Sequence, residues 1–572
     1  MDILKVSELE KLRSQLENER SSFLSHWKML GDYILPRRPR FNVTDINKGD
    51  RRNTNIIDST ATLAARTLRS GMMSGVTSPA RPWFRLTTPD PDMAEFGAVK
   101  SWLHTVSQRM ETTFLKSNIY NNLPILYGDM GVFGTGAIFI EEDFNDVLRS
   151  WSVPIGSYCI ATDRDGKVCV FTREIPMTVR KLIDRFGKLD KSGNPIWDNF
   201  SVTVRNLWDG NNMDSIVDVV HIIQPNPNFS PNMIDSKFKK YISIYYEKGA
   251  SSDNKKLQES GYNFFPVLCP RWEITGEDSY GSDCPGMTAL GDIRSLQLMH
   301  KRKSQAIAKM VNPPLTGPSS LRSQKVSLLP GDLTFSDERD GMKGLRPIHD
   351  TNPRIQELVF DIQEHQGRIK RAFYEDLFLM LSTSDRRNIT ATEVEERHEE
   401  KLLALGPVLE QINQDLLDPL IDNTFEFMVR QGRIPEPPEE LQGVDLKVEY
   451  ISIMAQAQKL LGISGIERFA GFVGGLVTTT QDPSILDKID IDQTIDEYGD
   501  ATGVPPKIIR SDDEVQARRE NRAKAQQAQQ SQAAIEALTK GAKDLSQVDM
   551  SKDTALTRLA QDANAGSLVA TQ

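Results

Sequence analysis

The sequence has few of the residues that form disulfide frameworks or metal sites. The 572-residue chain contains only four cysteines, and no two of them form a C-x-x-C pair: Cys159, Cys169, Cys269 and Cys284. Its 7 histidines are scattered, and no H-E-x-x-H motif occurs. Structural disulfides and zinc sites normally need such clusters. We therefore expect buried free thiols in a reducing compartment, and neither a metal ion nor a cofactor.

Long apolar runs are also missing. No stretch approaches the roughly 18 consecutive apolar residues that a membrane-spanning helix needs. The chain begins MDILKVSELEKLRSQ, which lacks the apolar core of a secretory signal. We expect neither a membrane span nor secretion.

Nucleotide-binding and catalytic motifs are lacking too, since neither G-x-x-x-x-G-K-[ST] nor G-x-S-x-G occurs. The glycine-rich segment GDMGVFGTGAIFIEED, residues 128–143, follows an expected helix and leads into an expected strand. Phosphate-binding loops have the opposite order, strand before helix. We interpret the segment as a packed helix-to-strand turn, and we favour a structural or assembly role over an enzyme.

A basic excess is the last feature that the sequence lacks. With 69 Lys and Arg against 79 Asp and Glu, the formal net charge is -10. Proteins that grip DNA by its phosphates usually carry a positive surplus. The average surface is thus not suited to tight DNA binding. The basic loop PRRPRFNVTDINKGDRR, residues 36–52, is either solvated or a contact to nucleic acid or a partner.

The first half of the chain indicates helices followed by a β-rich block. A capping box at Ser7-x-x-Glu10 begins a helix whose apolar stripe continues to Ile34. Further helices are expected at 54–80 and 93–128, with a short strand at 82–86 between them. Alternating apolar runs and turn residues predict strands over 150–280, with one helix near 177–187.

The second half contains two long helices that flank a small module. Residues 286–310 and 354–381 have helical apolar stripes, and residues 315–350 between them indicate a compact β-like module. The polar loop STSDRRNIT then leads to a helix capped at Thr390, with breaks expected at Gly406-Pro407 and Pro419. Two such helices form an antiparallel stalk with the module at its tip. Their half-apolar surfaces would be covered in a ring of copies.

Five stretches carry a resemblance to a known family. They are SGMMSGVTSPARPWFRL at 70–86, YGDMGVFGTGAIFIEED at 127–143, GMTALGDIRSLQLMHKRKSQAIAKMVNPPL at 286–315, RNITATEVEERHEEKLLALGPVLEQINQDLLDPLI at 387–421, and GVPPKIIRSDDEVQARRENRAKAQQAQQ at 503–530. In these stretches and their order, the chain resembles the portal, or head-to-tail connector, proteins of short-tailed bacteriophages. The resemblance is diffuse over 188–262 and over the last 40 residues.

The resemblance implies an α+β, mostly helical portal fold that assembles as a ring. It places the parts of that fold on this chain as follows: the wing at 1–285 and 392–440, the stem helices at 286–311 and 354–381, the clip at 312–353, the tunnel loop at 381–391, the helical crown at 441–530, and a partly disordered polar tail at 531–572.

The resemblance also implies function and partners. We expect a dodecamer at one capsid vertex that forms the channel for packaging and ejection of double-stranded DNA. Terminase and a tail adaptor would dock on it, and the major capsid and scaffolding proteins would surround it. The protein would reside in the virion, and in the host cytoplasm during assembly. The alternatives are another phage structural protein (a scaffold or tail adaptor) and a DNA-processing enzyme.

A few basic rings would suffice to centre a duplex in an otherwise acidic channel. The candidates are Arg386, Arg387 and Asn388 in the tunnel loop and Lys301, Arg302 and Lys303 in the stem. The alternative for each basic side chain is a solvated or inter-subunit salt-bridged position.

Overall fold

The structure is a computed structural model. It describes residues 4–41, 49–90, 93, 96–188, 195–233, 235–249, 255–276, 278–317, 346–347, 355–383, 405–441, 443, 446–451, 469–476, 479, 490–502 and 515–529. The chain divides into two compact units. One comprises Met1–Pro89 and Trp102–Gly503, and the other comprises Asp90–Ser101 and Val504–Gln572. In the second unit the structure describes the first residues of one helix and a helix over 515–529.

The chain begins with helix α1 (Val6–Tyr33), in which Leu9, Trp27 and Leu30 are buried as the stripe predicts. The expected cap is wrong, because the helix begins one residue before Ser7. The backbone N–H of Lys5 donates to Glu8 Oε2 at 3.4 Å. Glu10, which we expected to complete the cap, instead accepts hydrogen bonds from Arg13 and from the Tyr246 hydroxyl.

Helices α2 (Thr60–Gly75), α4 (Gly97–Lys116) and α5 (Ile119–Phe133) follow. The helix expected at 93–128 is therefore two helices, separated at 117–118. The glycine-rich segment forms the end of α5, Gly134 in the left-handed conformation (φ 79°), and then strand β2 (Ala137–Asp143). This confirms the helix-to-strand turn.

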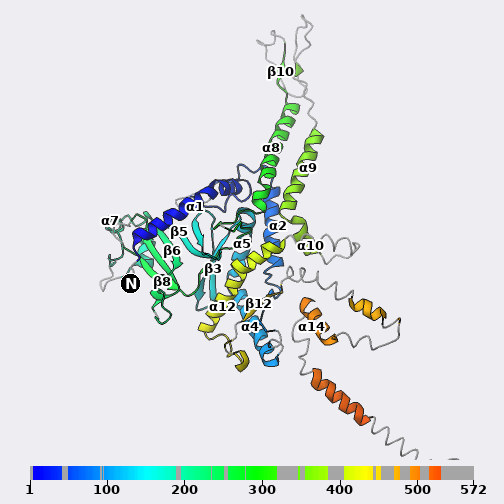
Figure 1. The fold of residues 1–572 in the computed structure, drawn as a ribbon. Coiled ribbons are helices and arrows are strands. Elements are labelled where there is room, and N and C mark those ends of the chain that lie inside the picture. Colours follow the sequence, from blue (N-terminus) through cyan, green and yellow to red (C-terminus); the bar gives the residue numbers. More distant parts are fainter. Residues whose placement is uncertain are drawn as a thin grey trace, which may run out of the picture. The chain divides into compact units, whose positions relative to one another are not determined.

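Two antiparallel sheets form the expected β-rich block (Figure 1). Strands β3 (Val147–Val153), β2 and β9 (Val267–Leu268) form one, in that order. The other has the order β4-β5-β6-β7-β8, whose bounds are Tyr158–Thr162, Val168–Thr178, Ile216–Pro225, Tyr241–Glu247 and Gln258–Tyr262.

The five-stranded sheet is covered on both faces. Val220, Ile222 and Ile244 pack against Val6 and Leu9 of α1. The opposite face packs against α6 (Val179–Phe186), the expected helix, and α7 (Val202–Asp209), which we did not predict. A 3₁₀ turn, η1 (Ser236–Phe238), precedes β7. Strand β1 (Phe84–Thr87) lies elsewhere and pairs with β12 (Lys447–Tyr450), from the distant end of the unit.

Helix α8 (Pro285–Val311) and helix α9 (Ile355–Ala372) run side by side away from the sheets, with β10 at their far end (Figure 1). Strand β10 (Leu315–Thr316) pairs with β11 (Arg346–Pro347). The other residues of the module expected at 315–350 lie outside the described part of the chain, apart from Gly317.

The expected helix 354–381 is interrupted. Helix α9 ends at Ala372, and α10 (Glu375–Thr383) begins after Tyr374, which has a positive φ of 55°. After this break, α10 packs on α2, where Phe378 lies against Gly71.

The expected helix after the polar loop is described from Leu405 onward. Gly406 and Pro407 are the second and third residues of this described stretch, and the residues before Leu405 lie outside the described part, so the break expected there stays a prediction. A π-helical turn, η3 (Asn413–Leu417), immediately precedes α12 (Asp418–Arg430), near the break expected at Pro419. A 3₁₀ turn, η4 (Glu439–Leu441), a helix over 469–476 and α14 (Ile491–Thr502) follow.

Candidate functional site: the α8–α9 helical pair

The α8–α9 pair is the element that the sequence singled out, and its two halves differ in burial. Near the sheets, Ile293 and Leu296 of α8 are fully buried. Further out, no residue of α8 from Leu298 onward is buried, and Leu298 is 48% exposed. On α9, Phe360 is 67% exposed. Isolated exposed apolar residues are ordinary, but two helices that leave the core together need another cover for such side chains.

A loop of the N-terminal segment fixes the base of the pair. The side-chain oxygen of Gln297 accepts from the backbone N–H groups of Ile57 and Asp58, at 2.7 and 2.8 Å. Its amide nitrogen donates to the Asp58 carbonyl at 2.9 Å. Gln297 is 5% exposed, so one loop supplies this buried amide with three hydrogen bonds.

The Asp58 carboxylate joins the two helices. Gln366 of α9 donates to its Oδ2 at 2.9 Å, and Nε2 of His300 of α8 lies 3.1 Å from the same atom. Burial favours the neutral carboxyl, but hydrogen bonds from Thr60 and Gln366 outweigh it, so the pKa of Asp58 is lowered. The carboxylate therefore stays ionised between the helices.

A second polar contact sets the register of the pair. Asp292 of α8 lies 2.8 Å from Nδ1 of His365 and 3.5 Å from the guanidinium of Arg368, both on α9. These contacts fix which residues of the two antiparallel helices lie at the same height.

The structure separates the three predicted stem cations. Lys301 and Arg302 are exposed, whereas Lys303 is half-buried. Successive residues of a helix are turned by about 100°, so Lys301 and Lys303 lie on nearly opposite sides. The three side chains therefore do not form one cluster. Arg386, Arg387 and Asn388 lie outside the described residues.

The helix that follows the polar loop is anchored by a buried ion pair. Nε of Arg271 donates to Oδ2 of Asp415 at 3.0 Å, and its Nη2 donates to the Gly166 carbonyl at 2.7 Å. Arg271 is 2% exposed. Asp415 lies in the π-helical turn η3, so this turn positions the carboxylate for Arg271.

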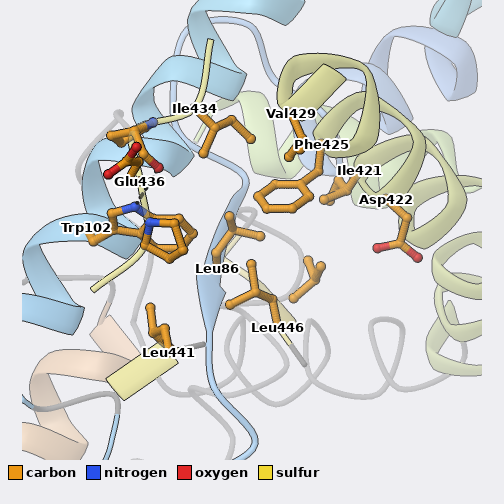
Figure 2. Close-up of a pocket in the computed structure, with 13 residues that line it drawn as sticks. Leu86, Trp102, Ile421, Asp422, Phe425, Val429, Ile434, Glu436, Leu441 and Leu446 are labelled. Atoms are coloured by element: carbon orange, nitrogen blue, oxygen red, sulfur yellow. Dashed lines mark hydrogen bonds between the residues drawn. The ribbon is translucent and has the colours of Figure 1, made fainter. Parts of the chain in front are cut away.

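A cavity of about 680 Å³ lies between α12, β1, β12 and the proline-rich segment after α12 (Figure 2). Its walls are mostly apolar, with Trp102, Phe425 and Ile434 around it, and Asp422 and Glu436 supply two carboxylates. Trp102 Nε1 donates to the Pro435 carbonyl at 3.1 Å, which holds the proline-rich segment. These groups offer packing and no nucleophile–base pair.

Part of the basic loop at 36–52 serves an internal role. Arg38 donates to both carboxylate oxygens of Asp129 through Nε, at 2.7 and 2.9 Å, and to Ser152. Asp129 is 1% exposed. Among the described residues, no group of three His, Cys, Asp or Glu side chains could hold a metal ion.

The cysteines are free, and three of the four are buried. Burial raises the pKa of the Cys159 and Cys284 thiols to about 12. In the described part of the chain, none of the helices has the length and apolar character that crossing a membrane requires.

Sequence reasoning missed the residues that hold the pair together, namely Asp58, Asp292, His365 and Gln366. One signal was present. Gln297 and His300 are polar residues on the otherwise apolar stripe of α8, and such positions need buried partners. Which loop supplies the partner is a long-range property that the pattern does not contain.

Comparison with known proteins agrees with the sequence resemblance. The family described as bacteriophage head to tail connecting protein matches residues 6–509. The portal protein of Salmonella phage epsilon15 is 48% identical over 97% of this chain and 98% of its own length. A probable portal protein of Bordetella phage BPP-1 is 44% identical over 95% of this chain and 96% of its own. The chain therefore belongs to the phage head-to-tail connecting, or portal, protein family, whose members are structural virion components at the head–tail junction and not enzymes.

Proposed function

We propose that twelve copies of this chain form a ring at one capsid vertex and that double-stranded DNA passes through its centre during packaging and ejection. The observation that supports the ring most directly is the α8–α9 pair, which projects from the sheets with its outer half uncovered. A ring of copies covers the flanks of each pair and leaves one side towards a lumen.

The family assignment supports a division of labour along the chain. We assign the wing to 1–285 and 392–440, the stem to 286–311 and 354–381, the clip to 312–353 and the tunnel loop to 381–391. The crown is 441–530, and the tail is 531–572. Because a ring has one narrow end where the stems meet, the clip is the docking surface for terminase and later for the tail adaptor.

The negative charge suits a channel. Twelve copies together carry a formal charge of about -120, since each contributes -10. A wall of cations would bind phosphates with release of counterions and slow the passage of DNA. An acidic channel with a few basic rings centres the duplex without holding it.

We assign the DNA contacts to Arg386, Arg387 and Asn388 of the tunnel loop. Arginine suits phosphates that move past, because its planar fork donates several hydrogen bonds. In the stem, helical geometry lets only one of Lys301 and Lys303 face the lumen. Arg302 lies between them around the helix, on a different flank.

The partners follow from the place of a portal in the virion. The major capsid and scaffolding proteins contact the wing during assembly in the host cytoplasm, and the energy for packaging comes from a separate terminase. These assignments rest on the family and on the missing nucleotide-binding motif.

Exchange of the two loop arginines tests the channel assignment. Arg386→Ala combined with Arg387→Ala is expected to leave rings and their incorporation into proheads intact and to lower the yield of DNA-filled particles. The measurements are ring thermal stability and DNA content per particle. Fewer rings, with normal DNA retention in each assembled particle, would show that the arginines pair between subunits instead.

A further inference from the structure

The outer flanks of the α8–α9 pair have opposite charges. From Ile293 to Val311, α8 contains five Lys or Arg residues and no Asp or Glu. From Ile355 to Gly367, α9 contains three Asp or Glu residues and no Lys or Arg. The pair therefore presents a basic helix beside an acidic one.

On α8, the relevant residues lie on the side away from α9. Ile293, Leu296 and the half-buried His300 form the stripe that faces the rest of the subunit. Leu298 lies on the other side, and Arg294 and Arg302 lie one turn before and after it. Both arginines are exposed, and neither forms an ion pair within the described residues. We call Arg294, Leu298 and Arg302 the α8 flank.

The exposed side of α9 has the same construction with the opposite charge. Ile362, His365 and Ile369 face the subunit, with Ile362 and Ile369 at most 4% exposed. Phe360 lies on the far side between Glu357 and Glu364, which are three and four residues away. We call Glu357, Phe360 and Glu364 the α9 flank.

The contact of Asp292 with His365 and Arg368 shows that the two flanks match in height. Both helices advance 1.5 Å per residue, in opposite directions. Leu298 lies six residues after Asp292 on α8. Because α9 runs the opposite way, the positions at the same height lie six residues before His365 and Arg368, and Phe360 lies between these two positions. By the same reasoning Arg294 is level with Glu364, and Arg302 is level with Glu357.

Two glycines extend the match towards the sheets. Gly291 of α8 is level with Gly367 of α9, and a Cβ added at either position would meet no atom within 4 Å. Glycine inside a helix costs about 0.5–1 kcal/mol relative to alanine. No described residue of the subunit packs on these two positions, and a second helix can approach closely there.

We propose that the α8 flank of each copy docks on the α9 flank of the next copy, with Leu298 against Phe360 and with Arg294 and Arg302 against Glu364 and Glu357. This inference rests on the ring proposed above. Rotation about the ring axis keeps each residue at one height, so where the pair runs along that axis the levels that match within a subunit also match between neighbours. The contact is heterologous and therefore continues around the ring.

A pair of introduced cysteines tests the contact. Leu298→Cys and Phe360→Cys in one chain place one thiol on each of the two flanks. After mild oxidation of purified rings, we expect a ladder of covalent oligomers up to ring size on a non-reducing denaturing gel. Each single variant and the parent protein are the controls. Three of the four native thiols are buried, and burial raises the pKa of Cys159 and Cys284 to about 12, which slows their oxidation. Cys169 is half-buried, and the parent protein shows how much cross-linking it contributes.

The outcomes distinguish this inference from the ring itself. Rings in the electron microscope together with only monomers on the gel would overturn the flank contact and leave the ring standing. Dimers from Leu298→Cys alone would also overturn it, since two α8 flanks would then meet. If the wild-type protein forms no rings, both proposals fail.

A charge exchange covers the case in which the double-cysteine variant does not fold. Arg294→Glu should raise about fivefold the protein concentration at which half the subunits are in rings, the size expected for one exposed ion pair. Adding Glu364→Arg should restore the wild-type value. Gln363→Arg, next in sequence but about 100° around the helix, is the matched control and should restore nothing. Failure of Glu364→Arg to restore assembly would contradict the proposal.

Discussion

At the scale of single residues, two buried ion pairs connect distant segments of the chain. Arg271 and Asp415 form a buried ion pair, and Arg38 and Asp129 form another in which Asp129 is 1% exposed. Both pairs join segments far apart in the sequence. A buried pair contributes little net stability compared with apolar residues, but loss of one partner leaves an uncompensated charge.

Arg271→Met should therefore destabilise the protein strongly, by about 3–5 kcal/mol, because the Asp415 carboxylate would remain buried without its partner. Arg271→Met combined with Asp415→Leu should recover much of the loss. Thermal unfolding of the three proteins measures both effects. A double variant no more stable than the single one would show that the pair acts through geometry and not through charge.

His221 predicts a pH dependence of stability. It is 0% exposed, its Nε2 lies 3.0 Å from Ser243 Oγ, and its ring stacks on Tyr245. Burial, followed by the charges of Arg173 and Arg185, holds the pKa of His221 well below its usual value. Below about pH 6.5, this histidine binds a proton in the unfolded chain but not in the folded protein. The free energy of unfolding therefore decreases as the pH is lowered, by up to about 1.4 kcal/mol per pH unit.

His221→Gln should remove this contribution. Carboxyl groups with raised pKa values, such as Glu111 at about 7, are present in both proteins, so the comparison isolates His221. Between pH 6.5 and 5, the melting temperature of the wild type should decrease more than that of the variant. Above pH 7 both curves should be flat with respect to this group. Parallel curves below pH 6.5 would mean that His221 does not account for the acid sensitivity.

At the scale of elements, close packing positions the start of helix α8 on helix α5. Helix α8 leaves the sheets where Gly286 lies against α5, and a Cβ at this position would be 2.5 Å from the Val132 carbonyl oxygen. Gly286→Ala should therefore lower the melting temperature, because backbone must move to make room. Ser295→Ala in the same helix is the control and should change little, since alanine is a good helix former. Equal melting temperatures for both variants would contradict the packing argument.

The long elements could be predicted from the sequence, and their interruptions could not. The bounds of α8 follow from a helical stripe that ends before Pro313-Pro314. The break at Tyr374 contains no Gly or Pro that would predict it from the sequence. It accompanies the packing of α10 on α2, a tertiary contact that local patterns do not contain. Pairing of β1 with β12 joins segments more than 300 residues apart, and local patterns contain no such information.

The candidate site was predictable to a similar degree. The sequence indicated a stalk of two helices and its cations, but consecutive residues such as Lys301, Arg302 and Lys303 look like one cluster when read linearly. On a helix they point in three directions. That Leu298 and Phe360 lie at the same height could not be predicted, because it requires the register of α8 against α9. This register depends on contacts with Asp58 and Asp292.

At the scale of the whole molecule, the proposed clip, residues 312–353, would separate ring formation from docking. Removal of 318–346 with a short linker in its place should leave rings intact and abolish binding of both terminase and tail adaptor. The stem and wing would still supply the contacts between copies. Pull-down of each partner by variant and wild-type rings measures this. Undiminished adaptor binding by the variant rings would refute the assignment of the clip.

Electron microscopy of the purified full-length protein, with native mass spectrometry of the same sample, tests the central claim most directly. The account predicts closed rings of twelve copies around a central hole, with the α8–α9 pairs side by side around it. Monomers alone at micromolar concentration, or open filaments without a closed ring, would contradict it.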